Sequence, residues 1–324
     1  MHNPESGVSE ETDEANSAVR IVGGNVFVEL DPDHPGFQDK EYRDRRNEIA
    51  KIAIEWNEMS MANRRTRKIP EAPYSDDEHD VWAAIMKRME PMHQKYACQQ
   101  YLKHAAQLGL PNDRIPQLQW VSERLQPLTG FRQEPVGGLV HPKTFHTALA
   151  NKVFLSTQYI RHSSHPFYTP EPDVVHELVG HTAMLAVPEW AELNTLFGEA
   201  DMRTQSEAAI TRLGTVFWFV MEFGICREND DIKAFGPGML SSFGEIEHAC
   251  SSGAACGRED ACVCDPQIEY RTPDFEEMET RPYDVTKYQP MLYLWDSFEQ
   301  MFEKTSEFVK TWGTEADPRR ELHQ

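Results

Sequence analysis

Apolar residues recur every three or four positions along much of the first third of the chain. This period places the apolar side chains on one face of an amphipathic helix. Two runs show it: Ile49, Ile52, Ala53 and Trp56, then Trp82, Ile85, Met86 and Met89. We therefore predict one helix from about Asp39 and a second that Pro91 ends or kinks, because proline lacks the N–H that a helix interior needs. A further helical stretch is expected from Tyr101 to Leu108, before the turn at GLPND.

Glycine and proline interrupt this pattern in the middle of the chain. Residues 129–142 (TGFRQEPVGGLVHP) are dense in both, which indicates an irregular loop that could line a pocket. After this loop we expect a helix from Lys143 to about Lys152 and a short extended piece from Val153 to Ile160. The prolines of RHSSHPFYTPEPD then exclude a regular helix until Asp173, which is suited to a helix start.

Helical spacing returns in the last part of the chain. An apolar stripe predicts a helix from about Ser206 to Gly224, with the glycine as its C-terminal cap. Residues 285–294 are consistent with an extended segment, and a last helix follows it. The apolar residues on one side of these two helices are Ile210, Leu213, Phe217, Val220 and Met221, then Phe298, Met301, Phe302, Phe308 and Trp312. The pattern therefore predicts two further helices in this part of the chain.

The size and charge of the chain bound its organisation and its partners. With 324 residues, of which 40% are hydrophobic, we expect one catalytic domain (21–315) between an acidic, disordered tail (1–20) and a polar C-terminal tail (316–324). A net charge of −21 argues against nucleic acid and membrane surfaces as partners, because both attract an excess of lysine and arginine. We find no apolar run typical of a signal peptide or of a membrane span, so we expect a cytoplasmic protein.

The six cysteines are distributed unevenly along the sequence. Cys98 and Cys226 stand alone, whereas the other four are crowded between Cys250 and Cys264. The spacing of this crowded group differs from the paired C-x-x-C of zinc ribbons and knuckles. We therefore favour a loop that bears thiols over a metal site in this segment.

The segment HELVGH offers two histidines to a metal, but at a spacing that differs from the zinc-peptidase motif. In H-E-x-x-H peptidases the two histidines lie four residues apart on one face of a helix. His176 and His181 lie five apart, which on a regular α-helix turns the second imidazole by about 140° from the first. Both rings can face one ion only if the helix loosens or ends near Gly180. A metallopeptidase is therefore disfavoured.

Glu222 supplies a carboxylate from a very apolar stretch, FWFVMEFG. An ionised carboxylate in such surroundings is costly unless a positive charge compensates it, and a divalent metal would do so. Two histidines and one carboxylate that leave open positions on the ion are the ligand set of non-haem Fe(II) oxygenases. The alternative is that Glu222 pairs with Arg212 or Arg227 and that the histidines cap a helix. Spacing and polarity alone leave both interpretations open.

Three long segments of the chain resemble the pterin-dependent aromatic amino acid hydroxylases. They are TQYIRHSSHPFYTPEPDVVHELVGH, FWFVMEFGICREND and AFGPGMLSSFGEIEHA, and the likeness extends from about Leu30 to Phe302. The resemblance implies a fold that is mainly α with small β elements, like the catalytic domain of that family. It also implies that His176, His181 and Glu222 are the Fe(II) ligands and the catalytic residues.

The same resemblance implies roles for residues around the metal. Arg161 would hold the carboxylate of the substrate, a task that its planar fork of donors suits. Further substrate contacts would be Thr169, Trp218, Ser241 and Val285. A tetrahydrobiopterin-like tetrahydropterin would lie against Phe145, and the other residues expected around it are Gly138, Val140, Glu177 and Phe217. Phe217 stands where relatives often have tyrosine, which puts any role of that hydroxyl in doubt.

The activity that the resemblance implies is hydroxylation of an aromatic amino acid, with O2 as co-substrate. Trp218 resembles the phenylalanine and tyrosine enzymes rather than the tryptophan enzymes, and Val285 resembles the phenylalanine enzymes. Conversion of phenylalanine to tyrosine is therefore the favoured reaction. Hydroxylation of tyrosine or tryptophan and meta-hydroxylation of phenylalanine stay open, as do a non-catalytic binding protein and a zinc hydrolase. We find no coiled-coil heptads after Trp312, which favours a monomer.

Overall fold

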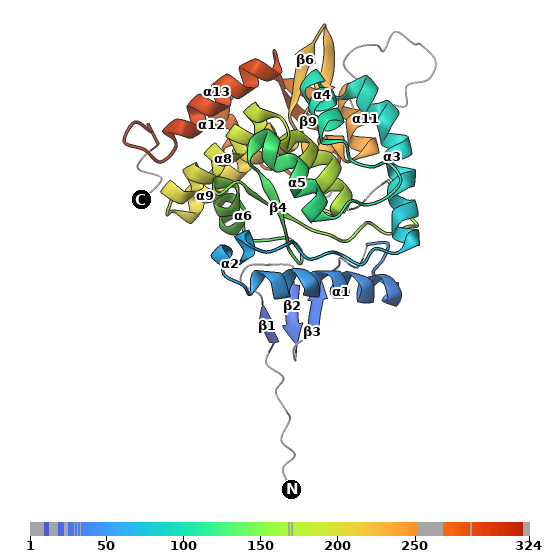
Figure 1. Ribbon diagram of the computed structural model, residues 1–324. Coiled ribbons are helices and arrows are strands. Elements are labelled where there is room, and N and C mark those ends of the chain that lie inside the picture. The colour runs from blue at the N-terminus through green and yellow to red at the C-terminus, as the bar shows by residue number, and fades with distance from the viewer. Residues whose placement is uncertain are drawn as a thin grey trace.

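The computed structural model describes residues 10–12, 19–22, 25–28, 30, 32, 34–167, 169, 171–251, 268–285 and 287–319, with the backbone alone for 10–28 and 251. Within these residues, helices make up most of the regular structure and the strands form three small sheets. Figure 1 shows the helices gathered around a common centre, with the small N-terminal sheet projecting on one side. The mainly α fold with small β elements is thus confirmed.

A three-stranded antiparallel sheet lies beside the first helix. Its strands are β1 (Glu10–Thr12), β2 (Val19–Val22) and β3 (Asn25–Val28), and β3 contacts α1 (Lys40–Asn57), as Figure 1 shows. The expectation of a disordered tail is therefore wrong for β1 and for the start of β2, because strand pairing satisfies their backbone groups whatever their composition. Helix α1 begins where predicted, since the Asp39 carboxylate accepts the backbone N–H of Tyr42 at 3.0 Å.

Four helices follow α1 along the chain. They are α2 (Met61–Arg65), α3 (Asp76–Tyr96), α4 (Gln99–Leu108) and α5 (Leu118–Thr129). Helix α3 begins with a capping box between Ser75 and Glu78 and continues through Pro91. Of the two predicted outcomes, an end or a kink at Pro91, the end is therefore wrong. The buried face of α3 extends on both sides of the proline, and burial of His93 and Tyr96 offsets the hydrogen bond that Pro91 cannot make.

Two short strands pair in parallel around the next helix. They are β4 (Arg132–Pro135) and β5 (Val153–Ser156), which α6 (Pro142–Ala150) connects. The prediction of an irregular loop over residues 129–142 is therefore wrong for its first part, where α5 ends and β4 runs. The reason is that β4 is stabilised by a partner about twenty residues further on, which a local composition does not reveal. Residues 136–141 keep the expected irregular backbone.

Two π-helices lie at the middle of the fold. They are η1 (His176–Thr182), which continues into α7 (Ala183–Leu185) and is followed by α8 (Pro188–Arg203), and η2 (Trp218–Glu222), which continues α9 (Glu207–Phe217). The helix predicted from Ser206 to Gly224 is confirmed in extent. Its cap is not Gly224, because Phe223 already closes the last turn by donating its N–H to the Trp218 carbonyl at 3.1 Å. The carbonyl of Gly224 instead accepts the N–H of Phe235, 3.0 Å away.

A four-stranded sheet and five short or medium helices close the fold. The strand order is β7 (Asp231–Ala234), β6 (Ile225–Glu228), β9 (Met291–Trp295) and β8 (Glu269–Arg271). Four of these helices are α10 (Pro237–Leu240), α11 (Phe243–Ser251), α12 (Phe275–Met278) and α13 (Phe298–Thr311). The fifth is α9, described above, which leads through η2 into the sheet. The extended segment predicted for residues 285–294 is confirmed only from Met291 onward. Arg319 contacts Glu279 at 2.7 Å, so the predicted polar tail packs on the domain at that point.

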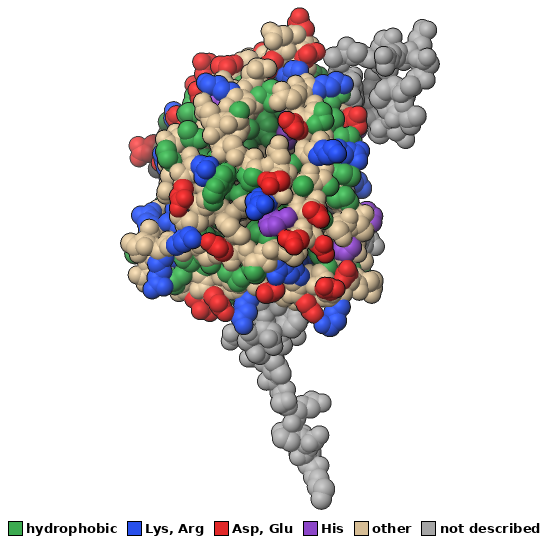
Figure 2. Space-filling view, turned by 45° about the vertical axis from the view of Figure 1, so that its right-hand side comes forward, with side chains coloured by type: hydrophobic (Ala, Val, Ile, Leu, Met, Phe, Trp, Pro, Cys, Tyr) green, Lys and Arg blue, Asp and Glu red, His purple; other side chains and the backbone are tan. Residues whose placement is uncertain are grey.

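The surface and the core follow the sequence pattern. Four tryptophans are fully buried: Trp82, Trp190, Trp295 and Trp312. The face drawn in Figure 2 carries acidic and basic side chains interspersed, with apolar side chains between them. Within the described ranges, no helix is long and apolar enough to span a bilayer. Cys98, Cys226 and Cys250 are buried thiols, and the rest of the predicted thiol loop, Cys256 to Cys264, lies outside the described residues.

Candidate metal centre and substrate site

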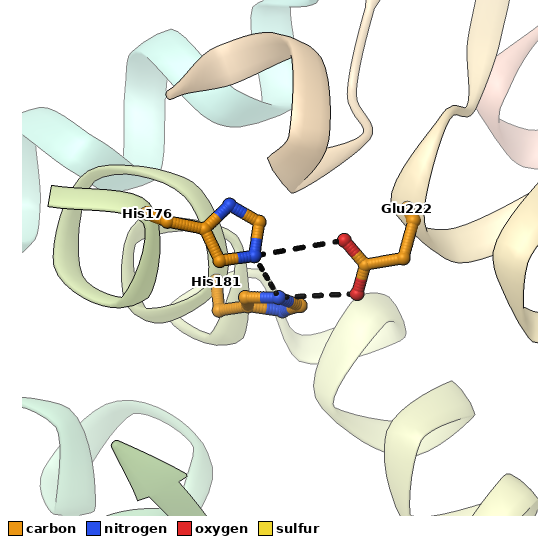
Figure 3. A group of neighbouring side chains, drawn as sticks. All are labelled: His176, His181 and Glu222. Atoms are coloured by element: carbon orange, nitrogen blue, oxygen red, sulfur yellow. Dashed lines mark hydrogen bonds and ion pairs between the residues drawn. The ribbon is translucent and has the colours of Figure 1, made fainter. Parts of the chain in front are cut away.

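The HELVGH segment adopts the loosened helix that its histidine spacing requires. Residues His176–Thr182 form the π-helix η1, in which i→i+5 hydrogen bonding brings residues five apart onto one face. The Asp173 carboxylate accepts the backbone N–H of His176 at 3.1 Å, so the predicted helix start at Asp173 is confirmed. The two imidazole rings consequently meet, with their centroids 4.7 Å apart. Figure 3 shows both rings pointing to the same side of η1.

Glu222, at the end of the second π-helix, faces the two histidines. Its Oε1 lies 3.1 Å from His181 Nε2, and its Oε2 lies 3.8 Å from His176 Nε2. The two Nε2 atoms are 3.0 Å apart, as the dashed lines in Figure 3 indicate. The ion pairs considered for Glu222 in the alternative interpretation are not formed: Arg212 contacts Glu279 at 3.6 Å, and Arg227 is exposed on β6.

This arrangement fits a divalent metal. Ligand atoms about 2.1 Å from an ion and at right angles to one another lie about 3.0 Å apart, close to the two shorter distances here. The Ser241 hydroxyl donates to the Pro237 carbonyl at 2.8 Å, and its oxygen lies 2.9 Å from His176 Nδ1. The hydroxyl hydrogen is thus used, so His176 donates from Nδ1 and presents the lone pair of Nε2 to the centre. Two imidazoles and one carboxylate form the Fe(II) ligand set with open positions.

Burial sets the protonation of these groups. Removal from water and the neighbouring His181 lower the pKa of His176 to about 4, so the ring is neutral as a ligand must be. Burial also raises the pKa of Glu222, but the His181 ring beside it has the larger combined effect and leaves that pKa below its usual value. Burial raises the pKa of Glu177 to about 7, against the hydrogen bonds that Thr157 donates to its carboxylate.

Arg161 is held rigidly beside the metal ligands. Its Nε and Nη2 donate to the two oxygens of Asp173, both at 2.8 Å, and both side chains are buried. The third nitrogen, Nη1, lies 3.5 Å from the backbone oxygen of Ser241. Because Asp173 also caps η1, one carboxylate fixes both the arginine and the start of the metal-binding helix. Sequence reasoning assigned Asp173 only the helix start, and its position three residues before His176 was the available signal.

Of the other residues expected around the substrate, Ser241 lies beside both Arg161 and His176. The Thr169 hydroxyl is buried and has no hydrogen-bond partner among the described residues, which suits a ligand contact. The Trp218 ring packs against Phe223 at 4.7 Å and stacks on Tyr283 at 4.5 Å between centroids. Val285 is 57% exposed and follows Tyr283 on the same loop. Tyr283 was missed by sequence reasoning, because its stacking partner lies 65 positions earlier in the chain.

Aromatic rings gather where the pterin was expected. Phe145 meets Phe154 and Phe217 edge to face, with centroids 5.7 and 6.0 Å apart. Val140 packs with Phe145 against one small apolar cluster, and Gly138 is buried in the segment that leads into α6. Phe154 in turn lies 4.7 Å from the His181 ring. The aromatic group and the metal ligands therefore adjoin one another.

Comparisons with known proteins agree with this geometry. Human phenylalanine-4-hydroxylase is 38% identical to the chain over 289 residues, covering 88% of the chain, and a tyrosine 3-monooxygenase from Schistosoma mansoni is 38% identical over 294 residues, covering 90%. The chain spans 59% and 58% of the lengths of these two relatives. The solved Chromobacterium violaceum phenylalanine hydroxylase with bound iron(III) and 7,8-dihydrobiopterin superposes with a TM-score of 0.66 at 26% identity, over 80% of the chain and 90% of that structure.

The family profile for biopterin-dependent aromatic amino acid hydroxylases matches residues 10–317. This match includes both π-helices, the arginine–aspartate pair and the aromatic group beside α6. It also covers nearly all of the residues that the structure describes. The chain therefore belongs to the biopterin-dependent aromatic amino acid hydroxylase family.

Proposed function

We propose that this protein is an Fe(II)- and tetrahydropterin-dependent monooxygenase that converts phenylalanine to tyrosine with O2. The observation that carries the proposal is the meeting of His176, His181 and Glu222 beside the Arg161–Asp173 pair. This places a three-ligand metal site next to a cation suited to a carboxylate. An amino acid bound by that cation can extend its side chain toward the open positions of the metal.

The protein's own groups orient the substrate. Arg161 offers Nη1 to the substrate carboxylate, because Asp173 occupies its other two donor nitrogens. Asp173 compensates the buried guanidinium before substrate arrives, and it keeps the fork in one orientation. The unpartnered hydroxyl of Thr169 offers a further polar contact. Trp218 and the His176 ring present flat aromatic surfaces to an aromatic side chain.

The buried setting of the site excludes water from the reacting groups. His181 and Glu177 are each about 5% exposed, and Phe217 is 6% exposed. When bound, Fe(II) and the tetrahydropterin supply the electrons and the position at which O2 is reduced, so that one oxygen atom enters the aromatic ring and the other leaves on the pterin. Phe145, Phe154 and Phe217 provide aromatic contacts for the flat pterin ring, and the carboxyl of Glu177 lies on the same helix as the metal ligands.

Two residues favour phenylalanine over the other aromatic amino acids. Trp218 resembles the phenylalanine and tyrosine enzymes rather than the tryptophan enzymes, and Val285 resembles the phenylalanine enzymes. The relatives include proteins named phenylalanine-4-hydroxylase and tyrosine 3-monooxygenase at the same 38% identity, so overall similarity does not choose between them. Tyrosine, tryptophan and the meta position of phenylalanine are thus the alternatives that a product assay distinguishes.

The test is a product assay on purified protein. Protein loaded with Fe(II) is given tetrahydrobiopterin, O2 and each aromatic amino acid in turn, and the products are separated by liquid chromatography. We expect tyrosine from phenylalanine as the main product, and no product without the pterin or the metal. Failure to hydroxylate any of the three amino acids would favour a binding protein. Full zinc occupancy with cleavage of peptides would favour a hydrolase.

We further propose that the protein is a cytoplasmic monomer. No helix among the described residues is long and apolar enough to span a membrane, which is consistent with this location. Light scattering of the purified protein measures its mass in solution, and a mass near 37 kDa is expected. A dimer or tetramer would contradict the monomer, and it would leave the proposed chemistry untouched.

A further inference from the structure

Among the described residues from 282 to 290, one side chain is buried. Among the described residues from 282 to 288 every side chain is exposed, including Tyr283 at 42%, Val285 at 57% and Tyr288 at 48%. Gln289 is 3% exposed. A buried primary amide has two donors and one acceptor to satisfy, and leaving them unpaired is costly. The contacts of the Gln289 side chain therefore indicate what this buried amide does in the loop.

The side chain of Gln289 connects the loop to the aromatic wall of the site. Its Oε1 accepts the indole N–H of Trp218 at 3.3 Å. Its Nε2 donates to the backbone carbonyls of Asp284 and Lys287, both at 3.1 Å. One amide thus ties Trp218 to the segment that carries Tyr283 and Val285.

The backbone of Gln289 is anchored as well. Its N–H donates to the Glu245 carboxyl on α11, which is 7% exposed. The adjacent Tyr288 lies over the start of α11, where its hydroxyl touches Gly244 and its ring lies 5.5 Å from His248. Gln289 is therefore fixed to α11 through its backbone N–H and to Trp218 through its side-chain amide.

Trp218 in turn is held from two directions. Its indole N–H is the single polar group of the ring, and Gln289 is its acceptor. Tyr283, on the loop that Gln289 closes, stacks on the Trp218 ring at an interplanar angle of 15°. Trp218 is also the first residue of η2, which ends at the metal ligand Glu222. A change in the orientation of this indole would alter the wall against which a substrate ring lies.

We propose that Gln289 is a positioning residue that sets which aromatic amino acid the site accepts, by holding the Trp218 indole and the 283–289 loop together. This inference rests on the proposed function of the site. Gln289 itself need not touch the substrate, because it acts through Trp218 and Tyr283. A purely structural role would instead affect stability and leave substrate preference unchanged.

Gln289→Met tests the proposal, because methionine fills a similar volume without donors or an acceptor. We expect the KM for phenylalanine to rise about three- to tenfold, the size of one lost net hydrogen bond or slightly more, and the ratio of kcat/KM for phenylalanine to that for tryptophan to fall. The KM for tetrahydrobiopterin should stay within about twofold of wild type. An unchanged KM and an unchanged preference would overturn the positioning role.

Gln117→Met is the matched control. The Gln117 amide also bridges backbone groups, accepting the N–H of Ala72 at 2.9 Å and donating to its carbonyl at 2.8 Å, but it lies at the start of α5. We expect this variant to lose stability and to keep the amino acid KM and the substrate preference of wild type. If Gln117→Met changed KM and preference as Gln289→Met does, the effect would reflect general destabilisation, and the proposal would be overturned.

A double-variant cycle separates an effect through Trp218 from any other. Trp218→Phe removes the indole donor, so adding Gln289→Met to it should change the KM for phenylalanine by less than about twofold. Independent effects that multiply in the double variant would overturn the proposal. A wild-type protein that hydroxylates none of the three amino acids would overturn the proposed function and this inference together. A wild-type protein that is active while Gln289→Met is unchanged would overturn the inference alone.

Discussion

The two π-helices that carry the proposed metal ligands are held in place by different means. Around η1, buried charges and short hydrogen bonds dominate: Asp173 caps the helix and binds Arg161 through two bonds of 2.8 Å, and Ser241 orients His176. Around η2, ring stacking by Tyr283 and one amide contact from Gln289 hold Trp218. The η1 side therefore has strict charge and distance requirements, whereas the η2 side can be altered in small steps. We expect the hydroxylation reaction to depend on the η1 side, and the choice of substrate to depend on the η2 side.

Loss of the Glu222 carboxylate should have the largest effect on activity. This carboxylate ends η2 and faces the two histidines of η1, so the proposed metal site needs it together with both π-helices. We expect Glu222→Ala to lower hydroxylation below about one thousandth of wild type, since a metal centre supplies several kcal/mol of stabilisation. Iron content, measured by elemental analysis after dialysis, should fall with activity. Glu199→Ala, on an exposed position of α8, is the control and should retain both. Full activity with two protein ligands would contradict the metal site.

Asp173→Asn breaks the charged pair on the η1 side. The buried Arg161 guanidinium then lacks its carboxylate, and we expect a loss of about 3 kcal/mol in the free energy of unfolding. The KM for the amino acid should rise about 10- to 100-fold, because the arginine is no longer held in one orientation. Urea denaturation and steady-state kinetics measure the two effects.

The matched control for this change is Asp317→Asn. Asp317 is also buried and accepts from Arg319 Nε at 2.7 Å, but near the C-terminus. Asp317→Asn should lower the free energy of unfolding and leave the KM for the amino acid unchanged. If both variants raised the KM equally, the role of Asp173 at the site would be contradicted.

A pair of glycines compares the tolerance of the two sides directly. A Cβ on Gly180 in η1 would lie 2.9 Å from the backbone oxygen of Pro237 and 3.1 Å from its Cα, so the backbone of α10 would have to move. We expect Gly180→Ala to cost about 2 kcal/mol. A Cβ on Gly244 would meet the hydroxyl of Tyr288, a half-exposed side chain that can rotate away, and Gly244→Ala should cost less than about 1 kcal/mol. Thermal denaturation measures both losses of stability. Equal losses for Gly180→Ala and Gly244→Ala would contradict the expected difference in tolerance between the two sides.

The last prediction depends on pH and concerns Glu245 under the loop on the η2 side. Burial raises the pKa of this carboxyl to about 8, against the hydrogen bond from Gln289. The folded state therefore retains a proton that the unfolded state loses above its ordinary pKa of 4.5, so this group makes stability fall as the pH rises from about 5 to about 8. Relative to wild type, Glu245→Gln should gain up to about 1 kcal/mol per pH unit over this range. Parallel stability curves for the two proteins would contradict the raised pKa.

Local patterns were sufficient for the elements that depend on local chemistry. The start of α1 at Asp39, the helix ending before Gly109 and the cap at Asp173 were predicted because a short polar side chain or a glycine marks each position. The need for a loosened helix at HELVGH followed from the spacing of His176 and His181. The cost of burying Glu222 made this carboxylate a candidate for the third ligand, and the family resemblance then implied that role.

Features that depend on distant partners were not predictable in this way. Strand β4 was read as loop because its stabilising partner β5 follows only after α6. Pro91 was expected to end or kink α3, and the helix does not end there, because packing on both sides of the proline sustains it. Tyr283 and Gln289 gave no signal in the sequence, since their roles depend on a contact with Trp218 about 70 residues away.

Isotopically labelled O2 tests the central claim most directly. Wild-type protein with Fe(II), tetrahydrobiopterin and phenylalanine is incubated under labelled O2 in ordinary water, and the tyrosine formed is analysed by mass spectrometry. We expect the new hydroxyl group of tyrosine to carry the label, and the Glu222→Ala protein to form no labelled tyrosine. Tyrosine that takes its oxygen from water, or labelled tyrosine formed equally by the Glu222→Ala protein, would contradict a monooxygenase whose metal is bound by His176, His181 and Glu222.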